Sequence, residues 1–77
     1  MNIEWNEYIN KVSDYIGKDP GQINENTNIY GDLGLDSLGI FSLGMYLVKE
    51  FKVKISLNSI ATIETIGDIY RLLIKAE

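Results

Sequence analysis

The residues with the clearest chemical potential lie in one stretch, Asp32-Leu33-Gly34-Leu35-Asp36-Ser37-Leu38. Asp36 is a favourable N-cap for a helix beginning at Ser37, because its carboxylate can accept a hydrogen bond from a free N–H group of the first turn. We therefore expect the Ser37 hydroxyl to be exposed at the start of that helix, where it is open to chemical modification. The alternative is that Ser37 is only a favoured polar residue of a first turn. Asp32 is interpreted as a solvated loop acid.

Other kinds of reactive site are excluded by composition. The 77 residues include no histidine and no cysteine, so a disulfide framework, a zinc site, a thiolate nucleophile and a Ser-His-Asp triad are all absent. The nucleophile elbow of serine hydrolases also needs glycines two residues before and after the serine, and position 35 is leucine. The chain is predicted to bind no metal and to be no enzyme.

Net charge and hydropathy exclude further classes of protein. Eleven acids against seven bases give a net charge of −4, which argues against a nucleic-acid partner. No apolar run approaches the roughly 20 residues that span a bilayer, and the N-terminus does not resemble a signal peptide. A hydrophobic content of 45% is ordinary for a globular protein. We expect a single domain over residues 1–77, monomeric and cytoplasmic.

Hydrophobic periodicity predicts the elements that position the serine. A first helix over residues 3–16, with Asn2 as N-cap and Gly17 as C-cap, is indicated by apolar residues at helical spacing. A long loop over residues 17–36 follows, and loops of this length in compact domains tend to be functional. Its apolar side chains are expected to anchor it on the helices; they are Ile23, Ile29, Leu33 and Leu35.

The apolar spacing and the capping residues in the second half of the chain predict three more helices. The helix that begins at Ser37 should extend to Phe51, and residues 52–55 should form a loop. Ser56 is expected to cap a short helix over residues 57–62, and Thr65 and Asp68 form the capping box of a last helix ending near residue 75. The inward face of this last helix should be Ile66, Ile69, Tyr70 and Leu73. The predicted fold is all-α, a four-helix bundle with three main helices, a short third one and a long structured first loop.

In this architecture the stretch Leu33-Gly34-Leu35-Asp36-Ser37-Leu38 resembles the phosphopantetheine attachment site of acyl carrier proteins, whose hallmark is leucine, glycine, any residue, aspartate, serine and leucine. The resemblance covers nearly the whole chain. It implies that a phosphopantetheinyl transferase moves 4′-phosphopantetheine from coenzyme A onto Ser37, and that the thiol of this arm carries an acyl or aminoacyl thioester. It also implies that Asp36 helps the transferase to engage its magnesium-bound substrate.

The same resemblance implies the other partners, which are an acyl- or aminoacyl-loading ligase and synthase, transferase or condensation enzymes. Helix geometry is compatible with the implied arm. A phosphodiester on Ser37 would lie beside the free N–H groups and the positive dipole end of its helix, an interaction worth about 0.3–1 kcal/mol at an exposed site.

One feature departs from the family. Carriers of primary fatty-acid synthesis usually have a strongly acidic second helix, whereas here Glu50 is the only acid between Ser37 and Lys52. Electrostatic steering by this helix should be weak. We hypothesise an apolar docking surface, with the alternative that most of its residues are core and the expectation that at least one is buried. The candidate residues are Leu38, Ile40, Phe41, Met45 and Val48.

The neutral helix favours a specialised polyketide, aminoacyl or secondary-metabolite pathway over primary fatty-acid synthesis. The alternatives are a fatty-acid carrier, or an unmodified protein-interaction module of the same fold. Two glycines of the helix remain open to interpretation. Gly39 permits close approach of a partner or of the arm, and Gly44 leaves room for a bulky neighbour such as Phe41 or for an acyl chain.

Overall fold

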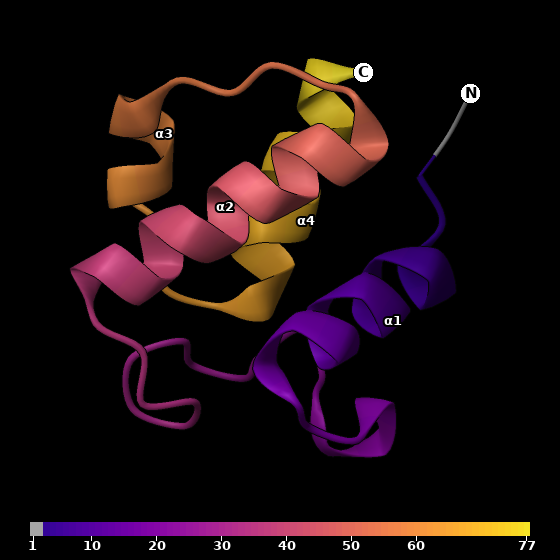
Figure 1. Ribbon diagram of the computed structural model, residues 1–77, viewed down its shortest axis with the longest axis vertical. Coiled ribbons are helices and arrows are strands. Elements are labelled where there is room, and N and C mark those ends of the chain that lie inside the picture. Colours follow the sequence, from indigo (N-terminus) through magenta and orange to yellow (C-terminus); the bar gives the residue numbers. More distant parts are fainter. Residues whose placement is uncertain (1–2) are drawn as a thin grey trace.

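The computed structural model describes residues 3–77, which form helical segments joined by loops (Figure 1). The segments are α1 (Trp5–Ile16), the short 3₁₀ helix η1 (Pro20–Gln22), α2 (Ser37–Phe51), α3 (Leu57–Ala61) and α4 (Ile66–Ala76). The described residues contain no β-strand, only an isolated bridge between Asn28 and Thr65. The predicted all-α fold, with three main helices and a short third one, is confirmed. No helix in this part of the chain is long and apolar enough to cross a membrane.

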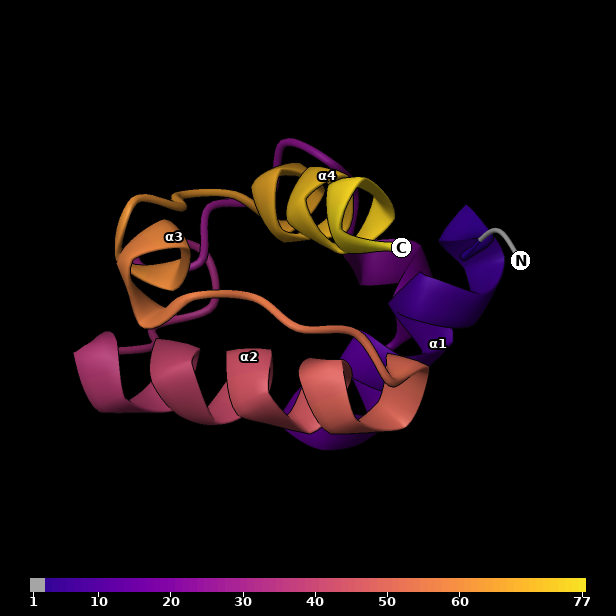
Figure 2. The ribbon, with the colours of Figure 1, turned by 90° about the horizontal axis from the view of Figure 1, so that it is seen from above.

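The helices enclose one hydrophobic core. In Figure 2, α2 lies along one side of the molecule, α3 and α4 lie on the opposite side, and α1 flanks them. Each of these helices and the long loop contribute buried apolar side chains, because each turns one apolar face inward. The buried hydrophobic residues are Ile3, Tyr8, Ile9, Val12, Ile23, Ile29, Ile40, Leu43, Leu47, Ile60, Ile63, Ile66, Ile69 and Leu73.

The start of α1 differs from the prediction. The helix begins at Trp5 rather than at residue 3, and Glu4 occupies the N-cap position without a side-chain cap. The predicted cap, Asn2, lies outside the described residues. Ile3 is buried, its N–H donates to Glu77 Oε1 at 2.6 Å and its carbonyl accepts from the Tyr70 hydroxyl at 2.8 Å. Its backbone polar groups are therefore used in tertiary contacts with the C-terminal part of the chain, and the helix starts after it.

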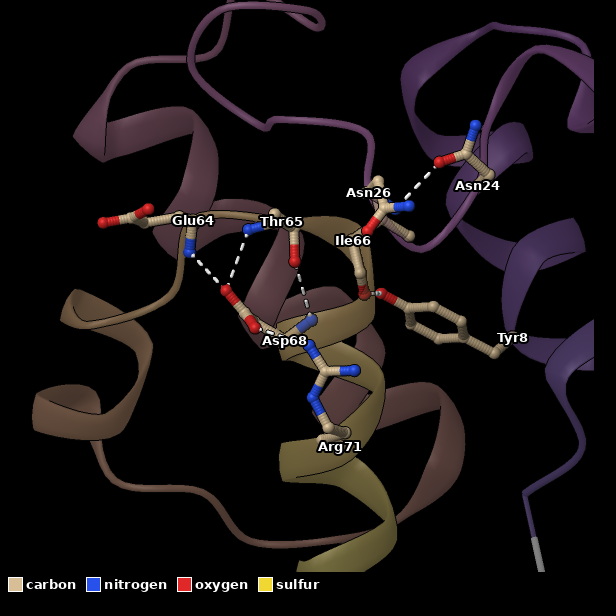
Figure 3. A network of polar contacts seen from close by, with 8 residues as sticks. All are labelled: Tyr8, Asn24, Asn26, Glu64, Thr65, Ile66, Asp68 and Arg71. Atoms are coloured by element: carbon tan, nitrogen blue, oxygen red, sulfur yellow. Dashed lines mark hydrogen bonds and ion pairs between the residues drawn. The ribbon is translucent and has the colours of Figure 1, made fainter.

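The later helix ends follow the predicted local chemistry. Gly17 ends α1 in the left-handed conformation, at φ 74°. Ser56 caps α3 by accepting from the Ser59 N–H, and residues 53–55 are irregular as expected. At the start of α4, Thr65 and Asp68 form the predicted capping box, each side chain accepting a hydrogen bond from the other's backbone N–H at 3.1 Å (Figure 3).

Asp68 also joins α4 to the segment before it. Its carboxylate accepts from Arg71 Nη2 at 2.7 Å and from the Glu64 N–H at 3.0 Å (Figure 3). The hydrogen bond from Arg71, followed by the one from Glu64, lowers the pKa of Asp68 to about 2. The carboxylate therefore stays ionised throughout the neutral and mildly acidic range.

A buried tyrosine joins α1 to α4. The Tyr8 side chain is fully buried, and its hydroxyl donates to the carbonyl of Ile66 at 2.6 Å (Figure 3). Burial raises the pKa of this phenol far above its ordinary value. The neutral hydroxyl supplies the hydrogen bond that a polar group in the core requires.

The long loop is packed against the helices, as predicted. Ile23 and Ile29 are buried, and Leu33 and Leu35 are half-buried. Three backbone hydrogen bonds attach the loop to the start of α4: Ile29 N–H to Glu64 O at 2.8 Å, Ile66 N–H to Thr27 O at 3.0 Å and Gly67 N–H to Glu25 O at 3.0 Å. We call this contact the loop–α4 clasp. It fixes the middle of the loop that leads to Ser37.

Candidate functional site

Ser37 is the first residue of α2 and is exposed. Asp36 precedes it as the N-cap, as expected, and its Oδ1 accepts from the Gly39 N–H at 2.8 Å. The N–H groups of Ser37 and Leu38 have no hydrogen-bond partner within residues 3–77. An exposed hydroxyl therefore lies beside two free backbone donors at the positive end of a 15-residue helix.

The loop before Ser37 is held by its own polar contacts. Asn28 Oδ1 accepts from the N–H groups of Tyr30 and Gly31 at 2.9 and 2.8 Å, and Asp32 Oδ2 accepts from the Asn28 N–H at 2.8 Å. Asp32 is exposed, as predicted, and it also stabilises this turn, a role that was not predicted from the sequence. Gly34 then adopts a left-handed conformation at φ 69°, which favours glycine.

A small hollow adjoins the serine between α2 and α3. Its volume is about 60 Å³, and it is lined by Ser37 together with Tyr30, Ile40, Phe41, Ile60 and Ala61. The serine hydroxyl thus lies at the edge of an apolar depression. Tyr30 and Ala61 had no signal in the sequence, because their approach to Ser37 depends on how the loop and α3 pack.

The two glycines of α2 allow close packing within the chain. A methyl group at Gly44 would lie 2.9 Å from Ile60 Cδ1, so this glycine permits close packing of α2 on α3. Gly44 therefore leaves room for a bulky neighbour, as suggested, but that neighbour is Ile60 rather than Phe41. A methyl group at Gly39 would lie 3.3 Å from both Asp36 Oδ1 and Leu35 Cδ2. Glycine at position 39 thus leaves space for the capping carboxylate.

The predicted docking residues separate by burial. Leu38 and Met45 are 77% and 54% exposed, and Phe41 and Val48 are half-buried. Ile40 is only 2% exposed and belongs to the core. Ile40 is therefore not part of the docking surface, because it faces inward on α2 together with Leu43 and Leu47. This agrees with the expectation that at least one of the candidate residues is buried.

The exposed residues line a shallow, mainly apolar groove along α2. Its volume is about 660 Å³, and three of its lining residues, Ser42, Tyr46 and Lys49, were not predicted from the sequence. Helical spacing could have identified two of them, since Ser42 and Lys49 follow Leu38 at i+4 and i+11 on the same side of the helix. Tyr46 instead stacks on Tyr15 of α1, with ring centroids 4.8 Å apart.

Charge is distributed unevenly around the serine. Residues 19–48 contain the acids Asp19, Glu25, Asp32 and Asp36 and no base. Beyond them, Glu50 forms an ion pair with Lys11 of α1 at 2.8 Å, and this contact raises the pKa of Lys11. The serine end of α2 is therefore anionic, whereas the only acid within α2 is already paired.

The fold and the site define a small all-helical domain with an exposed serine at the N-terminus of its second main helix. A family model described as "Phosphopantetheine attachment site" matches residues 9–73. Acyl carrier proteins are also similar to the chain over most of its length. That of Thermotoga maritima is 38% identical over 58 residues, which cover 75% of this chain and 72% of that protein.

Two further relatives give the same result. The acyl carrier protein of Sinorhizobium fredii and the acyl carrier protein AcpP of Rhizobium meliloti are each 35% identical over 66 residues, covering 86% of this chain and 85% of theirs. The chain belongs to the acyl carrier protein family. Its cofactor is therefore covalently attached 4′-phosphopantetheine, and the exposed hydroxyl with its adjacent free N–H groups fits such a group.

Proposed function

We propose that Ser37 is the attachment point of 4′-phosphopantetheine and that the chain carries an acyl or aminoacyl thioester between enzymes. The observation that supports this most strongly is the exposed Ser37 hydroxyl at the start of α2, directly after the capping Asp36. In the proposed transfer, the Ser37 hydroxyl gives up its proton to a base supplied by the transferase, and its oxygen forms a bond to the phosphate of the pantetheine arm. The pyrophosphate bond of coenzyme A breaks and the adenosine bisphosphate leaves.

The residues around Ser37 suit the modified form. The free N–H groups of Ser37 and Leu38 would stabilise the phosphodiester, and Asp36 would engage the magnesium-bound substrate of the phosphopantetheinyl transferase. The arm supplies the thiol that a chain without cysteine lacks. In this proposal the polypeptide positions and presents the cargo and catalyses no step itself.

We assign the carrier to a specialised pathway with polyketide, aminoacyl or secondary-metabolite cargo. The support is the nearly neutral α2, because a carrier that serves many enzymes through basic docking sites would be expected to expose several acids there. Primary fatty-acid synthesis is the alternative, since the relatives are named only as acyl carrier proteins. The proposal also includes one domain over residues 1–77 that acts as a monomer in the cytoplasm.

The partners in this proposal are the phosphopantetheinyl transferase, a loading ligase and synthase, transferase or condensation enzymes. They would contact the chain at the Ser37 end of α2 and along its exposed side. Leu38, Phe41, Met45 and Val48 are the proposed contact residues, because all four border the groove beside the serine.

The test is intact-mass analysis after incubation with coenzyme A, magnesium and a promiscuous phosphopantetheinyl transferase. We expect the chain to gain the mass of one phosphopantetheine, and Ser37→Ala to gain none. Ser56→Ala is the control, because Ser56 is another exposed serine and lies outside α2 and its groove. It should be modified like the parent chain. An unmodified parent chain, or a modified Ser37→Ala variant, would contradict the proposal and favour an unmodified interaction module.

A further inference from the structure

The exposed side of α2 carries a continuous ridge that starts next to Ser37. Leu38, Ser42, Met45 and Lys49 follow one another at intervals of three and four residues and therefore lie along one side of the helix. All four are exposed and line the groove described above. We call these four residues the α2 ridge. Leu38 and Met45 line this groove together with the half-buried Phe41 and Val48, and such a contiguous apolar patch is typical of an interaction surface.

The charge along this ridge changes sign. Asp36 and Asp32 lie before its first residue, and no base occurs between positions 19 and 48. The ridge ends at Lys49, with Lys52 one turn further along the chain. Neither lysine forms an ion pair within residues 3–77, whereas Glu50 is engaged by Lys11 at 2.8 Å. The far end of the ridge thus presents positive charge that no described residue neutralises.

Resting on the proposed function, we propose that the enzyme receiving the arm presents an apolar strip to Leu38 and Met45 and a carboxylate to Lys49. Burying the ridge against a partner removes water from Lys49, and a desolvated ammonium group needs an acidic neighbour to offset that cost. The net negative charge of the chain alone would favour a basic docking site on the partner. At this end of α2, however, Lys49 and Lys52 would repel such a site.

The ridge also sets a distance on the partner. Lys49 lies eleven positions after Leu38 in α2, and eleven steps of helical rise correspond to about 16 Å. The carboxylate of the partner should therefore lie about this far, along the axis of α2, from the mouth that admits the arm. Because the centre of the contact is apolar, affinity should depend only weakly on salt. The single charged contact would instead fix the orientation of the carrier.

The experiment uses a coenzyme A analogue with a photoreactive group at the thiol end of its pantetheine arm. A promiscuous transferase attaches the analogue to Ser37, and intact mass confirms complete loading before the protein meets an extract of its native host. Irradiation then links the arm to whichever enzyme admits it, and the yield of each cross-linked species is measured. The variants are Met45→Glu, Lys49→Glu and Lys49→Arg, with Lys75→Glu, at an exposed position of α4, as the control.

We expect Met45→Glu to lower the yield about tenfold, because it places a charge in the apolar centre of the contact. Lys49→Glu should lower it about fivefold or more, while Lys49→Arg and Lys75→Glu stay near the parent value. Raising the salt concentration from about 50 to 300 mM should change the parent yield less than twofold.

A Lys49→Glu variant that cross-links as well as the parent, or better, would overturn the proposal and indicate a neutral or basic partner surface. So would a yield that collapses with salt, equal losses in Lys75→Glu, or the absence of any cross-linked species from fully loaded protein. A chain that gains no mass with the transferase would instead count against attachment at Ser37. The two failures are therefore distinguishable.

Discussion

At the scale of single residues, Asp36 combines two properties that can be separated by mutation. Its Oδ1 caps α2 through the Gly39 N–H at 2.8 Å, and its negative charge lies next to Ser37. The cap requires only an oxygen acceptor, whereas the proposed contact with a magnesium-bound substrate requires charge. An amide of the same shape preserves the first property and removes the second.

The substitution Asp36→Asn should therefore leave stability nearly unchanged while slowing modification. We expect the free energy of unfolding to change by less than about 0.5 kcal/mol, because asparagine caps helices as well as aspartate does. The initial rate of mass gain with the transferase should fall roughly tenfold. Urea unfolding and time-resolved intact mass measure the two effects.

Asp36→Ala provides the comparison, since it removes both the cap and the charge. It should cost about 1 kcal/mol of stability in addition to the slower modification. If Asp36→Asn is modified at the parent rate, Asp36 is only a helix cap.

Local residue chemistry explains why this part of the site was predictable. Asp36, Ser56 and the Thr65–Asp68 box act on backbone groups within three residues, so the sequence contains both partners of each contact. Ile40 behaves differently. Whether it faces a partner or the core depends on which side of α2 meets α3 and α4, and no short stretch of sequence contains that information.

At the scale of elements, the contact between α2 and α3 depends on a glycine. Gly44 is buried, and a methyl group there would approach Ile60 Cδ1 to 2.9 Å. The other Ile60 carbons, at 3.5 and 3.6 Å, would remain at ordinary contact distances. Among these contacts, only the one with the terminal methyl of Ile60 would be closer than an ordinary van der Waals contact.

Gly44→Ala tests this contact. Alanine would gain about 1 kcal/mol of helix propensity, but overpacking against a buried isoleucine costs about 1–3 kcal/mol, so we expect net destabilisation of up to about 2 kcal/mol. The double variant Gly44→Ala/Ile60→Val removes the Cδ1 methyl and should be more stable than the sum of the two single variants predicts. Thermal unfolding of all four proteins measures the difference. If the stability changes of the two single variants simply add in the double variant, Ile60 does not limit how closely α2 and α3 approach each other.

The ends of helices could be predicted from the sequence where a local cap or left-handed residue sets them. They could not be predicted where contacts with distant residues set them. The ends at Gly17 and Phe51 and the start at Ser37 agree with the sequence. The start of α1 does not, because Ile3 donates to Glu77 and accepts from Tyr70, both distant in sequence. The helix η1 was also missed, although Asp19, which accepts from Gly21, and Pro20 at its first position are typical of such a turn.

At the scale of the whole molecule, the loop–α4 clasp connects the serine-bearing half of the chain to its C-terminal helix. Gly67 permits the closest part of this contact. A methyl group on Gly67 would lie 2.8 Å from the Glu25 carbonyl oxygen, to which the Gly67 N–H donates. Because the Glu25 oxygen is a backbone atom, the clash can be removed only if the loop moves and the hydrogen bonds of the clasp lengthen.

Gly67→Ala should therefore destabilise the fold by about 2 kcal/mol or more, whereas Gly31→Ala in the same loop should be nearly neutral. Gly31 is the matched control, because its nearest neighbour to an added methyl is Asn28 Oδ1 at an ordinary 3.6 Å. Denaturant unfolding of the two variants gives the comparison. Equal stabilities would mean that the clasp contributes little to the native state.

The clasp itself could not be predicted from the sequence. The packing of the loop was expected from its apolar side chains, and Ile23 and Ile29 are indeed buried. Their partners lie near residues 64–67, however, and pairing between segments so far apart carries no local signal. Only the packing of the complete chain brings the two together.

This long-range pairing has a consequence during synthesis on the ribosome. Residues 25–29 obtain their hydrogen-bond partners from residues 64–67, which are translated about forty residues later. A nascent chain that ends before α4 thus leaves Ser37 on an unanchored segment, and a modifying enzyme that reads folded shape should ignore it. If Ser37 is the attachment point, as proposed, a transferase that recognises the folded domain would modify it only after α4 has been synthesised.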